Sequence, residues 1–299
     1  MPVPLLMFVP SRLLLVLLLA VIVAGCADSV DPTYDADKPY TLYGVLDPTA
    51  DSQALRVVPF APDLNPREPA PVGAEVTSTD LQTGETVTWR DSLVTFGEGR
   101  FGTVYLADFR PTYRHTYRIE ARREDGAVSS AEVTVPPFVE PLAQPMETPI
   151  GAVVLSAIWP AAPRLNEAQA VFVLADADCN TLTEAVPVSR PAEPFEFGWE
   201  VPTDFLEDAR LVLDNLAPNN NVALLDLRLR AVVSSDDWVP AGGVYDPEVL
   251  VDPNALTNVE DGFGFVGAGY VVDVSVTPGF DVVQRGGFRP RGSCVGGEG

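Results

Sequence analysis

Three glycines late in the chain have the spacing of a phosphate-binding loop. Gly262, Gly264 and Gly267 in the stretch GFGFVG match the pattern G-x-G-x-x-G. In dinucleotide-binding proteins this loop follows a strand and opens a helix, because the pyrophosphate binds at the N-terminus of that helix. Here the glycines run into residues 270–276, YVVDVSV, which favour a strand. We therefore expect no nucleotide cofactor, and glycines placed where a strand bends or lies close to another backbone.

Side chains for acid–base or nucleophilic catalysis are few. His115 is the only histidine, and no cysteine cluster accompanies it, which excludes the usual zinc sites. A Ser-His-Asp triad would need a nucleophile, and the chain has no G-x-S-x-G elbow. We expect His115 to be an ordinary strand residue and the protein not to be an enzyme.

Two pairs of neighbouring carboxylates suggest a second chemistry. Asp236-Asp237 stands beside Trp238, and Glu260-Asp261 precedes the glycines. Glycoside hydrolysis uses two carboxyl groups held at a set separation across the sugar. Adjacent pairs also arise by chance in a chain with 42 acidic residues. A glycan hydrolase that uses such a pair is therefore kept only as an alternative function.

The stretch of residues 176–180, DADCN, resembles the first half of a calcium-binding loop. An EF-hand would need glycine where Thr181 stands and an acid where Pro187 stands. We expect a plain turn and no metal ion, with an irregular calcium site as the alternative.

Tryptophans offer a possibility of another kind. Trp159, Trp199 and Trp238 could stack on sugar rings as exposed aromatics. Each is also a side chain that a sandwich core or a domain interface uses. The sequence leaves both roles open.

The N-terminus carries an export signal. Residues 13–23, LLLVLLLAVIV, form an apolar run that is too short for a membrane span of about 20 residues. Its length suits the core of a signal peptide, which we predict over residues 1–25. The end of this segment resembles a bacterial lipobox, in which cleavage precedes the cysteine and its thiol receives diacylglycerol. The four lipobox residues are Val23, Ala24, Gly25 and Cys26. We predict attachment to membrane lipid through Cys26.

This lipid would place the protein in a bacterial cell envelope. The residue after Cys26 is Ala27, whereas aspartate at that position is an inner-membrane retention signal in some bacteria. By that resemblance we expect an anchor in the outer membrane, with the body facing either the periplasm or the outside. Residues 26–38 are acidic and poor in apolar side chains, which predicts a flexible tether.

Two further cysteines remain, Cys179 and Cys294. In an oxidising envelope compartment two such cysteines can pair. A bridge would close a loop of more than a hundred residues and, if unstrained, stabilise the fold by up to roughly 4–5 kcal/mol. It would also hold the glycine-rich tail, residues 291–299, to the body. We predict this disulfide, with two free thiols as the alternative.

The mature chain is strongly acidic. Without Arg12 of the signal peptide it has 18 basic and 42 acidic residues, a formal charge of −24. Such a surface repels nucleic acid and anionic lipid headgroups, so we expect no nucleic-acid partner. A well-hydrated surface suited to salty surroundings accounts for the acidity, and capture of cationic ligands is the alternative.

The pattern of residues predicts an all-β fold. Twenty-nine prolines leave little room for long helices. Short alternating stretches recur about every ten residues over 39–137, which is typical of an immunoglobulin-like or transthyretin-like β-sandwich. Five prolines within residues 136–149 predict a linker over 138–149. A second β-rich domain is predicted over 150–290, with helical turns only at 166–169 and 203–208.

The glycine stretch also carries a family resemblance. Residues 257–268, TNVEDGFGFVGA, resemble the late signature N-[IV]-x-x-G-x-G-x-[FV]-G of an uncharacterised family of bacterial outer-membrane lipoproteins. The matching positions are Asn258, Gly262, Gly264 and Gly267. Family members have a lipobox and an N-terminal sandwich with a P-V-x-G-A-x-V strand, which residues 71–76, PVGAEV, resemble with one residue fewer. Members often lie beside TonB-dependent outer-membrane receptors, so the resemblance implies an accessory role for such a receptor.

These features predict a non-enzymatic, lipid-anchored envelope protein that works through binding, with a TonB-dependent receptor as the expected partner. A structural or adhesive surface lipoprotein is the first alternative, and the glycan hydrolase is the second. The sequence names no ligand.

Overall fold

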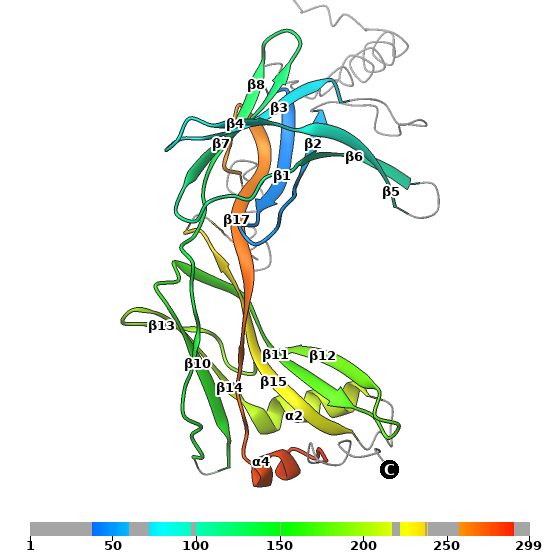
Figure 1. Ribbon diagram of the computed structural model, residues 1–299, viewed down its shortest axis with the longest axis vertical. Coiled ribbons are helices and arrows are strands. Elements are labelled where there is room, and N and C mark those ends of the chain that lie inside the picture. Colours follow the sequence, from blue (N-terminus) through cyan, green and yellow to red (C-terminus); the bar gives the residue numbers. More distant parts are fainter. Residues whose placement is uncertain are drawn as a thin grey trace, which may run out of the picture. The chain divides into compact units, whose positions relative to one another are not determined.

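The computed structural model describes residues 38–59, 72–96, 100–149, 151–216, 222–236, 238 and 257–289. Strands form three sheets, and the elements besides them are two short helices, within the described residues. The predicted all-β class is confirmed. In Figure 1 one long strand, β17 in orange, runs through the largest sheet.

The largest sheet has eight strands. Their spatial order is β12 (Thr181–Pro187), β11 (Arg164–Ala175), β15 (Ala223–Ser234), β17 (Gly262–Ser275), β1 (Tyr40–Leu46), β2 (Gln53–Pro59), β6 (Arg100–Ala107) and β5 (Arg90–Phe96). The pairing of β1 with β17 is parallel, and β17 is antiparallel to β15. Two chain segments far apart in sequence therefore meet at the middle of this sheet.

Two smaller sheets complete the described strands. The five-stranded sheet has the order β16 (Val259–Glu260), β8 (Val128–Thr134), β7 (Thr116–Arg123), β3 (Ala74–Asp80) and β4 (Thr86–Thr88). The four-stranded sheet has the order β13 (Glu193–Phe195), β14 (Gly198–Asp204), β10 (Val154–Pro160) and β9 (Leu142–Ala143).

Two hydrophobic cores form on the large sheet. The first core joins β1, β2 and the start of β17 to the five-stranded sheet through side chains such as Leu42, Leu55 and Ile119. The second core joins β11, β15 and the end of β17 to the four-stranded sheet, with Trp159 and Phe172 fully buried. Each sheet thus has one face against a core, as strand alternation requires.

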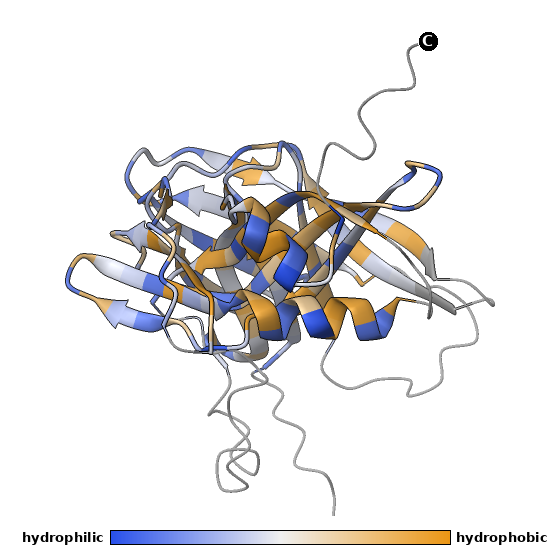
Figure 2. Cartoon of the chain, turned by 90° about the horizontal axis from the view of Figure 1, so that it is seen from below, coloured by the Kyte–Doolittle hydropathy of each residue, from blue (hydrophilic) through white to orange (hydrophobic). Residues whose placement is uncertain are grey.

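The helix α2 (Phe205–Asn215) covers part of the second core. Its N-cap is Asp204, whose carboxylate accepts a hydrogen bond from the backbone of Leu206. Phe205, Ala209 and Val212 follow helical spacing and are buried. The prediction of a single helical turn at 203–208 was therefore too short. Figure 2 shows hydrophobic and hydrophilic residues alternating along both helices, α2 and α4 (Phe280–Arg285).

The other predicted helical turn, at residues 166–169, was wrong. These residues lie within β11, where the register with β15 shifts between Asn166 and Gln169. Glu167 has a φ of 49°, and a residue in the left-handed region is typical of such a bulge. The polar residues that suggested a helical turn form this irregularity in the strand instead.

The structure also departs from the predicted domain division. Residues 150–290 were expected to form a separate domain, but Val259, Val266 and Ala268 belong to the first core. The predicted linker contributes to the second core through Val139 and forms β9 against β10. Because β1 pairs with β17, more than 200 residues later in the chain, the proline-rich segment does not separate two independent sheets.

Candidate functional site

The side of β2, β1 and β17 that points away from the first core presents aromatic and basic side chains, and we call it the outer face. Along β1, Leu42 and Leu46 are buried, whereas Tyr43 and Val45 between them are 49% and 42% exposed. Tyr43 is in register with Arg56 on β2 and with Phe265 on β17. Cross-strand neighbours in register share one side of a sheet, so these three side chains form a row across the strands.

Two glycines bring β17 close to β1. A methyl group on Gly264 would lie 2.1 Å from the carbonyl oxygen of Leu42, and one on Gly262 would lie 2.7 Å from the carbonyl oxygen of Tyr40. Gly264 also has a φ of +99°, which only glycine adopts readily. The glycine stretch lies inside a strand with no helix directly after it. The predicted close backbone approach is confirmed.

The third glycine makes room for a tryptophan. A methyl group on Gly267 would lie 2.6 Å from the indole ring of Trp238. That ring also makes an edge-to-face contact with Phe265, with the ring centroids 5.7 Å apart. The backbone amide of Trp238 donates to the carbonyl of Ser235. Because Gly267 has no side chain, the Trp238 ring can pack directly on its backbone at the outer face.

Asn258 completes the family-like motif. Its side-chain amide donates to the carbonyl of Val266 at 2.6 Å and accepts from the amide of Val266 at 2.9 Å. The side chain thus bonds to the β17 backbone as a neighbouring strand would. All four motif residues thus make structural contacts with β17 or its neighbours: the glycines allow close packing, and Asn258 bonds to the strand backbone.

Two cations lie at the outer face of this acidic protein. The ammonium group of Lys38 lies 4.6 Å from the centre of the Phe263 ring, within cation–π range. Thr41 of β1 is the register neighbour of Phe263. Arg56 is exposed beside Tyr43. The outer face therefore combines aromatic rings with positive charge.

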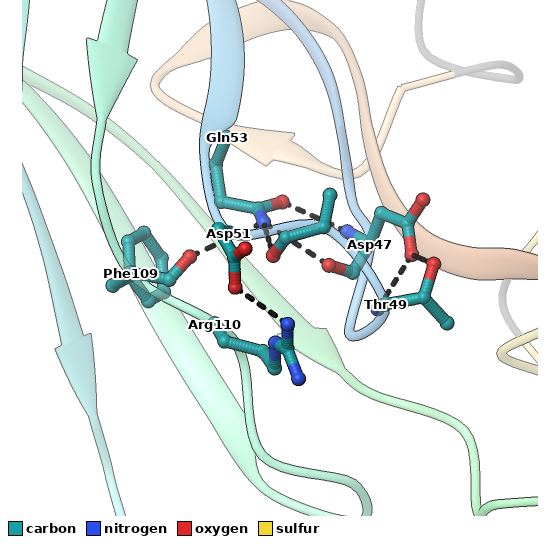
Figure 3. Close-up of polar contacts among 7 residues, drawn as sticks. Asp47, Thr49, Asp51, Gln53, Phe109 and Arg110 are labelled. Carbon is teal, nitrogen blue, oxygen red and sulfur yellow. Dashed lines mark hydrogen bonds and ion pairs between the residues drawn. The ribbon is translucent and has the colours of Figure 1, made fainter.

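The turn between β1 and β2 borders this face and is shown in Figure 3. Gln53 is only 2% exposed. Its oxygen accepts from the amide of Asp47, and its nitrogen donates to the carbonyls of Asp47, Ala50 and Phe109. The Asp47 carboxylate accepts from Thr49, as Figure 3 also shows. These carboxylate and amide groups stabilise the turn.

His115 precedes β7 and pairs with a carboxylate. Its Nδ1 lies 2.7 Å from Asp80 Oδ2. Burial of Asp80 acts to raise its pKa, but hydrogen bonds from His115 and from the backbone of Gln82 and Thr83 outweigh this and lower the pKa. The pair joins the end of β3 to the start of β7. His115 thus links two strands of the five-stranded sheet. It was expected within a strand, but it lies directly before β7.

The predicted carboxylate pairs occupy different surroundings. Glu260 of β16 is the register neighbour of Ser130 on β8. The carbonyl of Asp261 accepts a hydrogen bond from Ser129 Oγ at 2.7 Å. Asp236 is exposed near Trp238, and Asp237 lies outside the described residues. The hydrolase alternative stays a prediction.

The calcium-like stretch forms a turn stabilised by one side chain. The Asp176 carboxylate accepts hydrogen bonds from the backbone amides of Asp178 and Asn180 and from the side chain of Asn180. These hydrogen bonds lower the pKa of Asp176, and the one from the Asn180 side chain contributes most. No group of three metal-ligating side chains occurs within the described residues. Cys179 in this turn is disulfide-bonded. Its expected partner, Cys294, lies outside the described residues, so the pairing itself stays a prediction.

The three tryptophans separate into two roles. Trp159 is fully buried in the second core. Trp199 is half-buried against that core, and its indole donates to the carbonyl of Pro163 at 3.1 Å. Trp238 is half-buried on the outer face. Of the sugar-stacking candidates, Trp238 lies near the exposed Tyr43, and Trp199 lies near the exposed Phe195 and Phe197.

A buried carboxyl group in the second core was not found from the sequence. Asp208 on α2 is fully buried, and burial raises its pKa to about 6. Its carboxyl group accepts hydrogen bonds from Thr203 Oγ1 and from the backbone of Ser189. The available signal was its spacing, three residues after Phe205 and four before Val212, which places this acid on the buried face of the helix.

An apolar pocket of about 270 Å³ lies between the start of β15, the end of β17 and α4. Leu225, Val276 and Phe280 are among its lining residues. Asp226 at its edge is already paired with Arg228, Oδ2 to Nε, at 2.7 Å. The charged group at this pocket, Asp226, is therefore paired within the protein, whereas Arg56 on the outer face makes no ion pair within the described residues.

The predicted lipobox and signal peptide lie outside the described residues. No helix within the described part of the chain is both long enough and apolar enough to cross a membrane.

Comparison with known proteins gives no family. No family model matches the chain, and no curated protein matches it. Among solved structures, bovine butyrophilin in its crystal structure is 11% identical, with 80% of this chain and 100% of that chain covered and a TM-score of 0.20.

Proposed function

We propose that this protein is a non-enzymatic, lipid-anchored envelope lipoprotein that acts as a binding or accessory module for a TonB-dependent outer-membrane transport system. Two sequence features support the anchor and the setting. They are the lipobox that ends at Cys26 and the resemblance of residues 257–268 to outer-membrane lipoproteins. The observation that carries the binding role is the outer face of β2, β1 and β17.

The composition of this face favours binding over a purely structural role. Single exposed apolar side chains are common on protein surfaces, but Tyr43 and Val45 are exposed two residues apart on one side of β1, beside the aromatic residues of β17. Contiguous exposed apolar surface with a polar rim marks interaction sites. Tryptophan, tyrosine and arginine are also the residues that dominate binding energy at protein interfaces, and Trp238, Tyr43 and Arg56 lie here together.

The test is co-purification from native membranes. Tagged, lipidated protein is isolated in mild detergent, and a Cys26→Ser variant, which cannot receive the lipid, is isolated in parallel. We expect a TonB-dependent receptor, identified by mass spectrometry, at near-stoichiometric amounts with the wild type and much less with the variant. Protease treatment of intact cells reports which side of the membrane the body faces.

Recovery of the lipidated protein in large excess over any receptor would overturn the accessory role. Surface exposure without a receptor would then support the structural or adhesive alternative. Loss of radiolabelled lipid incorporation in the Cys26→Ser variant tests the anchor separately from the partner.

A further inference from the structure

We propose that the outer face is the docking surface of this protein, and that it binds an apolar loop carrying carboxylates on a membrane-resident protein. The location of the site and the chemistry of the partner follow from the described residues. The membrane setting rests on the proposed function.

The charge of the face selects an acidic partner. Seven arginines elsewhere pair with neighbouring carboxylates, namely Arg90, Arg110, Arg118, Arg122, Arg123, Arg228 and Arg230. Arg56 is exposed and makes no ion pair within the described part of the chain. Arg210 is exposed and without an ion pair within the described residues in the same way, so what distinguishes Arg56 is its place beside Tyr43 in the row. There its guanidinium is suited to a carboxylate on another molecule.

The apolar part of the face is already assembled before binding. Trp238 packs on the backbone of Gly267 and makes an edge-to-face contact with Phe265. Tyr43 lies on the middle strand of the row, between Arg56 and Phe265. Less rearrangement is then needed when a partner binds, which lowers the entropic cost of association. Apolar side chains on the partner loop would cover Tyr43 and Val45.

The position of the face limits where the partner can be. It begins at Lys38, and eleven residues separate Lys38 from Cys26. A chain of this length spans at most about 40 Å. A lipid on Cys26 would therefore keep the outer face near the membrane surface, where a receptor loop can reach it.

The experiment is site-specific photocrosslinking of the lipidated, full-length protein in native membranes. Benzoylphenylalanine replaces Tyr43, and in a matched control it replaces Leu211, which is 45% exposed on α2. We expect a crosslink from position 43, at least ten times stronger than from position 211, to an outer-membrane protein. Mass spectrometry should place the crosslinked peptide in a loop that contains aspartate or glutamate.

Charge reversal sharpens the test. Arg56→Glu should lower the crosslink yield from position 43 at least tenfold, whereas Arg210→Glu on α2, also exposed and without an ion pair within the described residues, should leave it unchanged. Circular dichroism checks that both variants fold. Arg56→Lys should retain part of the yield.

Three outcomes would overturn the inference. Crosslinks from position 43 to lipid or to glycan only would assign the face to another class of ligand. Equal yields from positions 43 and 211, or an unchanged yield in Arg56→Glu, would show that the face does not select a partner. If a receptor co-purifies while position 43 gives no crosslink to it, the docking surface is wrong but the accessory function stands. If no receptor co-purifies at all, the accessory function itself fails.

Discussion

The two halves of β17 are built for different neighbours. Its first half, up to Gly269, carries four glycines and lies parallel to β1 in the first core. Its second half carries Val271, Val272, Asp273 and Val274 and pairs antiparallel with β15. Glycine is used where another backbone or an aromatic ring leaves no room for a side chain, and branched residues return where that crowding ends. A glycine pattern in a strand thus reports what packs against it.

The largest test of this contrast is Gly264→Ala. The added methyl group would meet the Leu42 carbonyl at 2.1 Å, and the φ of +99° is unfavourable for alanine. We expect a loss of more than about 3 kcal/mol in the free energy of unfolding, measured with urea. Gly73→Ala is the control, because Gly73 has a φ of +69° but open space around it. Equal losses in both variants would show that backbone crowding is not what requires glycine in β17.

A second test uses the buried acid of the second core, Asp208 on α2. The pKa of Asp208 in the folded protein is raised to about 6, whereas its ordinary value in the unfolded chain is near 3.9. The folded state therefore binds more protons between about pH 4 and pH 6, and this group makes the protein less stable as the pH rises through that window.

Asp208→Asn should remove that dependence. We expect the free energy of unfolding of the wild type to fall by about 2 kcal/mol more than that of Asp208→Asn between pH 4 and pH 7. Asp204→Asn is the control, because it alters the neighbouring N-cap without removing the buried acid. A parallel pH profile for wild type and Asp208→Asn would contradict the assignment.

Tyr270 gives a third, smaller effect. Its hydroxyl donates to the carbonyl of Pro137 and accepts from the amide of Val139, both at 2.7 Å. Tyr270→Phe leaves that buried amide without its partner, so we expect a loss of about 1–2 kcal/mol. Tyr43→Phe on the outer face should change stability by less than about 0.5 kcal/mol. Similar values for the two would mean that the hydroxyl of Tyr270 contributes little.

The smallest effect on stability is expected at Gly267→Ala. Its methyl group would meet a side chain, the Trp238 ring at 2.6 Å, and a ring at the surface can move. We expect a loss of about 1 kcal/mol or less, well below that of Gly264→Ala, together with a red shift of tryptophan fluorescence as Trp238 leaves its place. An unchanged emission spectrum would argue against the packing of Trp238 on this glycine.

The sequence predicted local features better than distant ones. The β-branched run after the glycines correctly predicted a strand there, since the preference for strand is local. A helical turn was predicted at 203–208, but the full length of α2 was missed because the proline count argued against longer helices, although Phe205, Ala209 and Val212 follow helical spacing. The domain division failed because nothing in the sequence near residue 262 reveals a partner near residue 40. The outer face was missed for the same reason, since Arg56, Tyr43 and Phe265 become neighbours only through strand register.

The parallel pairing of β1 with β17 also constrains how the protein is made. Tyr40 and Gly262 are paired across more than 200 residues, and closing so long a loop costs entropy before the contact stabilises anything. The first core therefore cannot be completed while the chain is still emerging, although its other strands are made early. The N-terminal strands therefore stay without their final partner until β17 has been made.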